Sequence, residues 1–343
     1  MPGLDKMKNG IIIDQTRPDQ TRPDQTRPDQ TSLLPKIPTV AVVMSTFNGD
    51  KYLAEQIDSI LSQEGVNVEL YIRDDGSSDG TRDIISHYVT HHRNIHARLG
   101  RNLGYKKSFV LELCSVPEFD YYAFSDQDDF WKPGKIRSAL QIVRNKEKTE
   151  CRNIPVLYMS ALELADRNLV PISTIRQDNR IVSIGSLTLR RTLGGGCTML
   201  FNSRLRELVK SADVTELAEL CNGHDALFVE LTLITGGAAV YDPNSYILYR
   251  QHGQNTIGVP LTFRERIMTE AMRFRGHESE AARMFLELWD GEITPEARNI
   301  LETVAGYHEN LRSRLKIVFS LQFRTGDIRL STFGKLKALL GLL

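Results

Sequence analysis

The sequence has few cysteines, no long apolar run and no excess of charge of either sign. Its four cysteines are scattered without a C-x-x-C pair, which argues against a disulfide framework or a thiolate zinc site and favours a reducing compartment. No apolar run approaches the roughly 18 residues that a membrane-spanning helix needs. Because 43 basic residues balance 43 acidic ones, no overall field attracts nucleic acid, and we expect none as a partner.

The N-terminal region lacks the pattern of a signal peptide. The apolar run at 11–13 is too short, and the repeat DQTRP follows it three times between Asp14 and Pro28. We therefore expect a cytoplasmic protein. A repeat rich in Pro, Asp and Arg cannot bury a core, so residues 1–37 are predicted to be disordered, either as a docking linker or as an expansion without a role.

From Thr39 onward, apolar runs alternate with amphipathic segments. Strands are predicted at 39–44, 68–72, 94–100 and 121–124, and helices from Asp50, over 81–89 and over 106–115. This alternation predicts an α/β domain with a mainly parallel sheet and helices on both faces. Ligands of such sheets bind at the carboxyl ends of the strands, where the loops STFNG, RDDGSSDG and SDQDD occur.

The second half of the sequence has a more mixed pattern. Pro133 is expected in the first turn of the next helix, a position that suits proline. Further strands are predicted at 155–162, 197–202, 238–242 and 245–250, helices within 203–236, and helices alone from Leu261 onward.

The loop SDQDD brings three acids within four positions, directly after an apolar strand. Carboxylates this close repel one another unless a cation or hydrogen bonds hold them. Asp126 and Asp128 have the spacing to share a divalent cation, and Mg²⁺ typically takes one or two protein carboxylates together with phosphate oxygens. The alternative is a solvated acidic turn that also caps the following helix.

The loop RDDGSSDGT supports three interpretations. Asp74 and Asp75 end a strand, where a carboxylate can accept a hydrogen bond from a pyrimidine N–H. The second interpretation is capping of the next helix by Ser78 or Asp79, which leaves the two preceding acids unexplained. The third is a serine hydrolase, because GSSDG matches the nucleophile elbow with Ser78 as the nucleophile, although this leaves the acids at 126–129 unexplained.

Four segments in this order resemble family-2 glycosyltransferases: VAVVMSTFNGDKYLAEQIDSILSQ, LYIRDDGSSDGTRDII, NLGYKKSF and FSDQDDFWKPGKI. The form DQDDFW and the later YRQHGQNTIG are most similar to the rhamnosyltransferase branch. The resemblance covers about residues 39–260. It implies the GT-A fold, a dTDP- or UDP-sugar donor, a divalent cation (Mg²⁺ or Mn²⁺) and inverting chemistry. It also implies a glycan or lipid-linked acceptor in bacterial surface polysaccharide (O-antigen) synthesis, with L-rhamnose as the preferred sugar.

The resemblance also implies roles for single residues. Asp75 holds the pyrimidine base, Lys106 lies near the nucleotide or its phosphates, and Asp126 touches both ribose and the metal–diphosphate. The implied donor-binding residues are Thr46, Asn48, Asp74, Asp75, Lys106, Asp126 and Arg250. The implied metal ligands are Asp126, Asp128 and His252, with Asp129 either a further ligand or a helix cap.

Asp225, in HDALF, is the predicted catalytic base. An inverting transfer needs one carboxylate to take the proton of the acceptor hydroxyl. A helix-capping Asp225 is the alternative, and the two roles are compatible. Next to it, His224 either orients the base or has no special role. His252 follows a predicted strand, where it completes the metal shell or grips the diphosphate; the alternative is an ordinary surface histidine.

These assignments divide the chain into a disordered segment (1–37), a GT-A domain (38–260) and a C-terminal helical region (261–343). From Arg312 to Leu343 there are seven basic residues and one acid, Asp327, and leucines recur at helical spacing. Two alternatives remain open for this region. It contacts the inner face of the cell membrane as a basic amphipathic helix, or it packs on the catalytic domain or a second subunit.

Overall fold

The computed structural model describes residues 37–150, 153–176, 182–189, 195–221, 223–252, 277–326 and 328–341. From Ile37 onward the chain groups into one compact unit. The DQTRP repeats lie outside the described residues, as do 253–276, which contain the end of YRQHGQNTIG and the start of the predicted helical region. The boundaries after residues 37 and 260 stay predictions.

Nine strands form one sheet in the described part of the chain. They are β1 (Thr39–Thr46), β2 (Asn67–Asp74), β3 (Ile95–Leu99), β4 (Tyr121–Ser125), β5 (Phe130–Trp131), β6 (Val156–Ala165), β7 (Pro171–Ile175), β8 (Leu200–Asn202) and β9 (Ala238–Arg250). Their order is β3-β2-β1-β4-β8-β6-β9-β5, and β7 pairs with β6. The first four strands are parallel, whereas β8, β7 and β5 run antiparallel to their neighbours.

The parallel half of the sheet brings the polar loops to one edge. Thr46 at the end of β1 lies opposite Asp74 at the end of β2, and Met44 lies opposite Ser125 at the end of β4. The loops that follow these strands therefore leave the sheet at the same level, as the sequence predicts. β1 is buried on both faces, which explains why its sequence is an apolar run rather than an alternating one.

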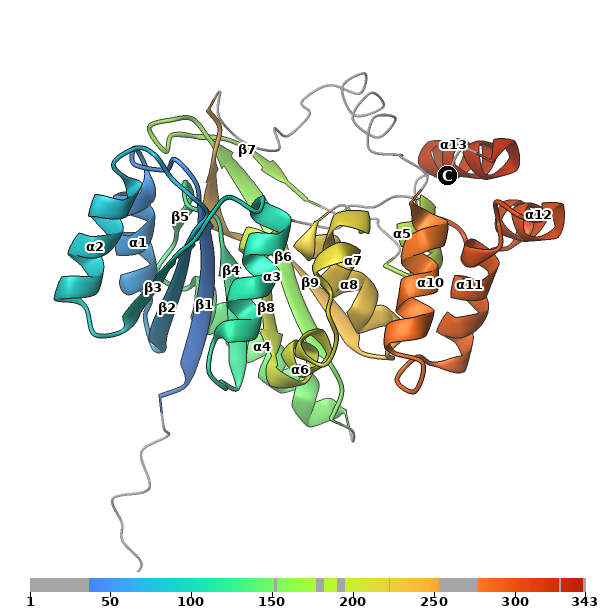
Figure 1. Cartoon of the computed structure of the whole chain (residues 1–343), viewed down its shortest axis with the longest axis horizontal. Coiled ribbons are helices and arrows are strands. Elements are labelled where there is room, and N and C mark those ends of the chain that lie inside the picture. Colours follow the sequence, from blue (N-terminus) through green and yellow to red (C-terminus); the bar gives the residue numbers. More distant parts are fainter. Residues whose placement is uncertain are drawn as a thin grey trace, which may run out of the picture. The chain divides into compact units, whose positions relative to one another are not determined.

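Helices cover both faces of this sheet (Figure 1). On one face Val42 packs in a core with α1 (Leu53–Leu61), α2 (Thr81–His91) and α4 (Lys135–Thr149). On the other face Val43 packs in a core with α3 (Tyr105–Ser115) and with later helices. The later helices in this second core include α6 (Ser203–Lys210), α7 (Thr215–Leu220), α8 (His224–Ile234), α10 (Glu278–Leu288) and α11 (Pro295–Ala305). The predicted α/β class is confirmed.

The second half of the sheet differs from the sequence-based expectation in three places. Residues 238–250 form one strand rather than two, because a register shift in the β6–β9 pair accommodates Pro243 and Asn244. The predicted strand at 197–202 is a short 3₁₀ turn (Gly196–Thr198) followed by β8. Pro133 lies before α4, which begins at Lys135.

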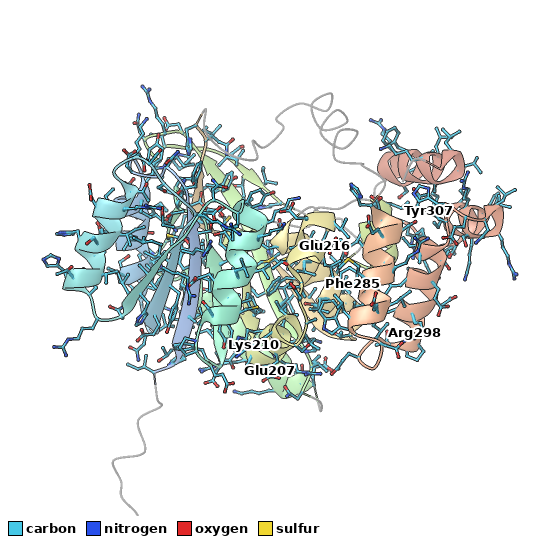
Figure 2. All side chains as sticks on the ribbon, in the orientation of Figure 1. Glu207, Lys210, Glu216, Phe285, Arg298 and Tyr307 are labelled. Atoms are coloured by element: carbon cyan, nitrogen blue, oxygen red, sulfur yellow. The ribbon has the colours of Figure 1, made fainter. Side chains whose placement is uncertain are left out.

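The C-terminal part is helical over its described residues, as predicted. It comprises α10, α11, α12 (Leu311–Phe319) and α13 (Ile328–Leu340), while the short α5 (Ile184–Leu189) comes earlier in the chain. Two of its largest buried side chains, Phe285 of α10 and Tyr307 after α11, are labelled in Figure 2. Among the described residues, no helix combines the length and the apolar character that crossing a membrane requires.

Candidate active site

The acid loop, residues 126–129, leaves the sheet directly after the fully buried strand β4. Asp126 is half-buried, and its pKa is raised to about 7 by burial first and then by the nearby charges of Asp128 and Asp225. The predicted catalytic base Asp225 is close enough for its charge to act on Asp126, although the two residues are far apart in the sequence. The fold thus brings together two predicted parts of one site.

Asp128 is paired with His252, a predicted metal ligand that lies just after the end of β9. His252 Nε2 lies 2.8 Å from Asp128 Oδ2, and both side chains are mostly buried. The imidazole also packs on the ring of Tyr52, with 4.9 Å between the ring centroids. The His252 side chain is therefore held in place by a carboxylate and an aromatic ring, unlike an ordinary surface histidine.

Arg250 fastens the end of β9 to the acid loop. Its Nε donates to the backbone oxygen of Asp128 at 2.9 Å, and its Nη1 donates to the backbone oxygen of Arg167 at 2.6 Å. Its Nη2 forms an ion pair with Glu55 of α1, and its guanidinium lies 4.4 Å from the Tyr52 ring centroid. Arg250 is 2% exposed, so these contacts position the loop, and its predicted donor contact stays a prediction.

A second set of buried groups lies behind the acid loop. Asp129 is fully buried, and its Oδ2 has no hydrogen-bond partner in the described part of the chain. One ligand atom each from Asp126, Asp129 and Cys197 lies within 4.8 Å of the others. Lys135 lies nearby with its Nζ 3.5 Å from the Trp131 ring centroid, and burial lowers its pKa to about 7.

The sequence did not single out Cys197 or Lys135 as site residues. Cys197 reaches the loop because the 3₁₀ turn before β8 packs against β4, and β8 pairs antiparallel with β4. Lys135 is the first residue of α4. The turn between the acid loop and α4 brings its side chain close enough to Asp129 and Asp126 for their charges to act on it. Cys197 has no local sequence signal. For Lys135 the only local signal is its position two residues after the proline of FWKPGK, close to the acid loop.

The two acids at the end of β2 hold the surrounding loops. Asp75 accepts hydrogen bonds from the backbone N–H groups of Leu103 and Gly104, at 3.0 and 2.9 Å. Asp74 is fully buried and paired with Arg82, whose Nε lies 2.8 Å from Asp74 Oδ2. These contacts give both acids a structural role, and their predicted contacts with a nucleotide stay predictions.

The loop after β1 supplies the other predicted nucleotide contacts. Thr46 is buried, and its hydroxyl has no hydrogen-bond partner within the described ranges. Asn48 has a positive φ of 48°, and its side-chain oxygen accepts from the backbone N–H of Ser78 at 2.9 Å. The loops after β1 and β2 therefore form one connected wall beside the acid loop.

Lys106 lies in the first turn of α3, where its ammonium group contacts α7. Its Nζ donates to the backbone oxygen of Glu219 at 3.2 Å and lies 3.4 Å from the Glu219 carboxylate. The structure thus directs this side chain toward a neighbouring helix. Its predicted contact with the nucleotide or its phosphates stays a prediction.

Asp225 lies in the first turn of α8, which begins at His224 after the N-cap Gly223, so the alternative of a helix-capping Asp225 is wrong. Its Oδ1 accepts from the backbone N–H of Ala226 at 2.9 Å. The preceding His224 is buried and stacks on Phe109 at 4.1 Å between ring centroids. Burial lowers the pKa of His224 to about 3, and neither ring nitrogen has a hydrogen-bond partner among the described residues, so His224 packs as a neutral ring and does not orient Asp225.

Ser78 has the surroundings of a turn residue. Its N–H lies 2.9 Å from the Asn48 side-chain oxygen, and its hydroxyl lies 3.5 Å from the same atom. Positive φ among non-glycine residues of the described chain is confined to Asn48 and Leu169, so Ser78 lacks the strained backbone of a nucleophile elbow. The contacts of Ser78 thus give the hydrolase interpretation no support.

A divalent cation fits the acid loop. Oxygen and imidazole ligands suit Mg²⁺ or Mn²⁺. Burial first, and then the charges of Asp128 and Asp225, raise the pKa of Asp126, and a bound cation would offset that repulsion. Asp126, Asp128 and His252 supply such ligands. The thiol of Cys197 suits these cations less well, because a soft sulfur ligand is matched to softer metals than Mg²⁺ or Mn²⁺.

The comparison with protein families decides what this arrangement is. The sequence model described as glycosyl transferase family 2 matches residues 41–169. This part of the chain belongs to glycosyl transferase family 2. The matched stretch of the glycosyltransferase contains the acid loop and the loops after β1 and β2, whereas Asp225 and His252 follow it.

Two curated relatives agree with this assignment. The dTDP-rhamnosyl transferase RfbG of Shigella flexneri is 25% identical over 232 residues, or 64% of this chain and 75% of that protein. TuaG of Bacillus subtilis (strain 168), a putative teichuronic acid biosynthesis glycosyltransferase, is 33% identical over 112 residues, or 32% of this chain and 43% of that protein. The chain is a glycosyltransferase.

Among solved structures, S. aureus TarS 1–349 is similar in fold. It aligns with a TM-score of 0.52 at 12% identity, covering 88% of this chain and 81% of that one. The structure of the same fragment in complex with UDP aligns with a TM-score of 0.50 at 14% identity, covering 89% of each chain. The GT-A fold that the sequence resemblance predicts is confirmed.

Proposed function

We propose that this glycosyltransferase is an inverting, metal-dependent enzyme that transfers L-rhamnose from dTDP-rhamnose to a growing polysaccharide or a lipid-linked oligosaccharide. The observation that carries this proposal is that Asp225 lies close enough to the acid loop for its charge to act on Asp126, after burial and the charge of Asp128. A base for the acceptor and ligands for a metal–diphosphate then lie in one site. The pairing of Asp128 with His252 adds a third ligand at 2.8 Å from that carboxylate.

In the proposed mechanism Asp225 removes the proton of the acceptor hydroxyl. The hydroxyl oxygen forms its bond to the anomeric carbon as the bond from that carbon to the donor diphosphate breaks, and the configuration inverts. Asp126, Asp128 and His252 would hold a divalent cation, which would supply Lewis-acid stabilisation of the leaving diphosphate. Arg250 and Tyr52 keep the loop and His252 in place.

The choice of donor has two supports beyond the motif DQDDFW. The relative RfbG is named as a dTDP-rhamnosyl transferase, and TarS, similar in fold, has been solved with UDP. Both donors carry a pyrimidine, whose N–H groups suit the carboxylates at the end of β2. A UDP-sugar, or another dTDP-sugar, is therefore the second candidate donor.

A donor panel tests the proposal. The purified full chain is incubated with dTDP-rhamnose, dTDP-glucose, UDP-glucose, UDP-N-acetylglucosamine or GDP-mannose, each with Mn²⁺, Mg²⁺ or EDTA. We expect dTDP-rhamnose to give the fastest nucleotide release, and EDTA to abolish it. If UDP-N-acetylglucosamine is turned over faster, the donor assignment is wrong. If no donor is turned over or bound, the transferase proposal itself is wrong.

A nucleotide-sugar-binding module without catalysis is the alternative function. It would keep the acid loop but would not depend on Asp225. The substitution Asp225→Asn separates the two possibilities, because donor binding persists in both cases and turnover collapses only if Asp225 is the base. We also propose that the enzyme works in the cytoplasm as a peripheral protein at the inner face of the cell membrane, where a lipid-linked acceptor is accessible.

A further inference from the structure

The surface at α12 and α13 exposes an unusual number of large apolar side chains. Phe319 is 77% exposed, Leu321 75% and Ile328 83%, and all three lie at or near the turn that joins α12 to α13. On α12, Leu311 and Leu315 precede Phe319 at four-residue intervals and are also exposed. Three residues at this spacing form one apolar stripe along α12. Leu321 extends the stripe into the turn that follows.

Basic residues surround this stripe. Arg312 and Lys316 are exposed beside it on α12, and Arg324 is exposed in the turn. The chain as a whole is neutral, yet its segment from Arg312 to Leu343 carries seven basic residues and a single acid. The charge of this surface is therefore a local feature rather than a reflection of overall composition.

Over its whole length α13 has almost no amphipathic pattern, so the predicted amphipathic helix is wrong for this element, but its leucines at helical spacing are exposed. Leu336, Leu339 and Leu340 are 53%, 41% and 60% exposed, whereas Ala338 between them is fully buried against the neighbouring elements. Figure 1 shows α12 and α13 next to each other at the C-terminal end of the described chain, and the two helices are in contact. Ile317 of α12, Phe323 of the turn and Ala338 of α13 are buried in the protein core, whereas the other large apolar side chains named above are left uncovered.

We propose that the surface formed by α12, residues 320–326 and α13 binds an anionic lipid bilayer. Apolar side chains enter the interfacial region while the surrounding arginines and lysines pair with lipid phosphates. A second copy of the chain is a poorer occupant, because a two-fold interface would bring the same basic residues against each other. This proposal rests on the proposed location at the membrane and specifies the surface that makes the contact. It does not depend on the donor, the metal or catalysis.

Vesicle sedimentation of the full-length protein tests this surface. Vesicles of phosphatidylcholine alone are compared with vesicles that also contain phosphatidylglycerol, at low and high salt. We expect the protein to sediment with the anionic vesicles at low salt and to be released by high salt. The double substitution R312Q/R324Q should weaken binding about five-fold for each basic residue removed.

The apolar part is tested by the triple variant F319S/L321S/I328S. It should lose at least ten-fold in vesicle binding, because three inserting side chains become polar. The matched control is V170S/I172S, which replaces residues that are 57% and 59% exposed near and on β7, and it should bind as the wild type does. Donor hydrolysis without vesicles should be unchanged in all variants, since none of these residues lies in the active site.

Three outcomes overturn the proposal. The wild type fails to sediment with anionic vesicles, or the triple variant binds them as well as the wild type does. In the third, the wild type is a dimer that the triple variant converts to a monomer, which would make this surface a protein interface. Because sedimentation is measured without a donor, an inactive enzyme that still binds vesicles would refute only the proposed catalysis.

Discussion

The side chain of Tyr52 contacts both Arg250, the last residue of β9, and His252, which follows β9. Its ring packs against His252 in a tilted arrangement, with 4.9 Å between the ring centroids, and its centroid lies 4.4 Å from the Arg250 guanidinium carbon. We expect Tyr52→Ala to weaken Mn²⁺ binding about ten-fold, as is common when a group that orients a metal ligand is removed. The ring-preserving Tyr52→Phe should bind as the wild type does. Mn²⁺ titration followed by electron paramagnetic resonance, without donor, is the measurement, and unchanged binding by Tyr52→Ala would refute this role.

His224 makes stability depend on pH. Its pKa is lowered by burial from the usual 6.5 to about 3, so the stability it contributes is present above pH 6.5 and is lost as the pH falls toward 3. This group should cost about 2 kcal/mol of unfolding free energy between pH 7 and pH 5. Urea unfolding at both pH values should show that cost in the wild type and in the exposed-site control His87→Gln. In His224→Phe it should be largely absent, and an equal cost in that variant would contradict the assignment.

At the scale of elements, the start of α3 depends on a backbone conformation that suits glycine. Gly104 precedes α3 with φ 84° and ψ 146°, and its N–H is fixed by Asp75. A Cβ added there meets no atom within 4 Å, so Gly104→Ala has only a backbone cost, on the order of 1–3 kcal/mol. Gly291→Ala also meets no atom within 4 Å and lacks the positive φ, so it should be nearly neutral. Chemical denaturation of both variants is the check, and equal costs would contradict the strain at Gly104.

The elements of the sheet show what the sequence can and cannot predict. The buried run of β1 and the loops after β1, β2 and β4 follow from local patterns, because a parallel register aligns the strand ends. The single strand β9 was missed, since Pro243 locally signals a turn and only pairing with β6 extends the strand through it. The short β5 and β7 were missed too, as two exposed or brief strands have no strong periodicity.

At the scale of the whole molecule, the site depends on contacts that no local pattern encodes. The resemblance to a family predicted Asp225, Asp128 and His252 as parts of one site, and the structure brings them together. It could not predict Cys197 or Lys135 behind the loop, because these arrive through antiparallel pairing of β8 and the start of α4. Arg250 and Asp75 hold the loops that build the site, and the donor contacts that the resemblance implies for them stay predictions.

The central claim is that Asp225 acts as a base beside a metal-binding acid loop. The direct measurement is nucleotide release from dTDP-rhamnose with Mn²⁺ by the wild type, by Asp225→Asn and by the exposed-site control Asp213→Asn, with dTDP binding followed by thermal shift. Asp225→Asn should lose about 10²- to 10⁴-fold in rate while binding dTDP as the wild type does, and Asp213→Asn should lose nothing. A rate for Asp225→Asn within a few-fold of the wild type would contradict the account.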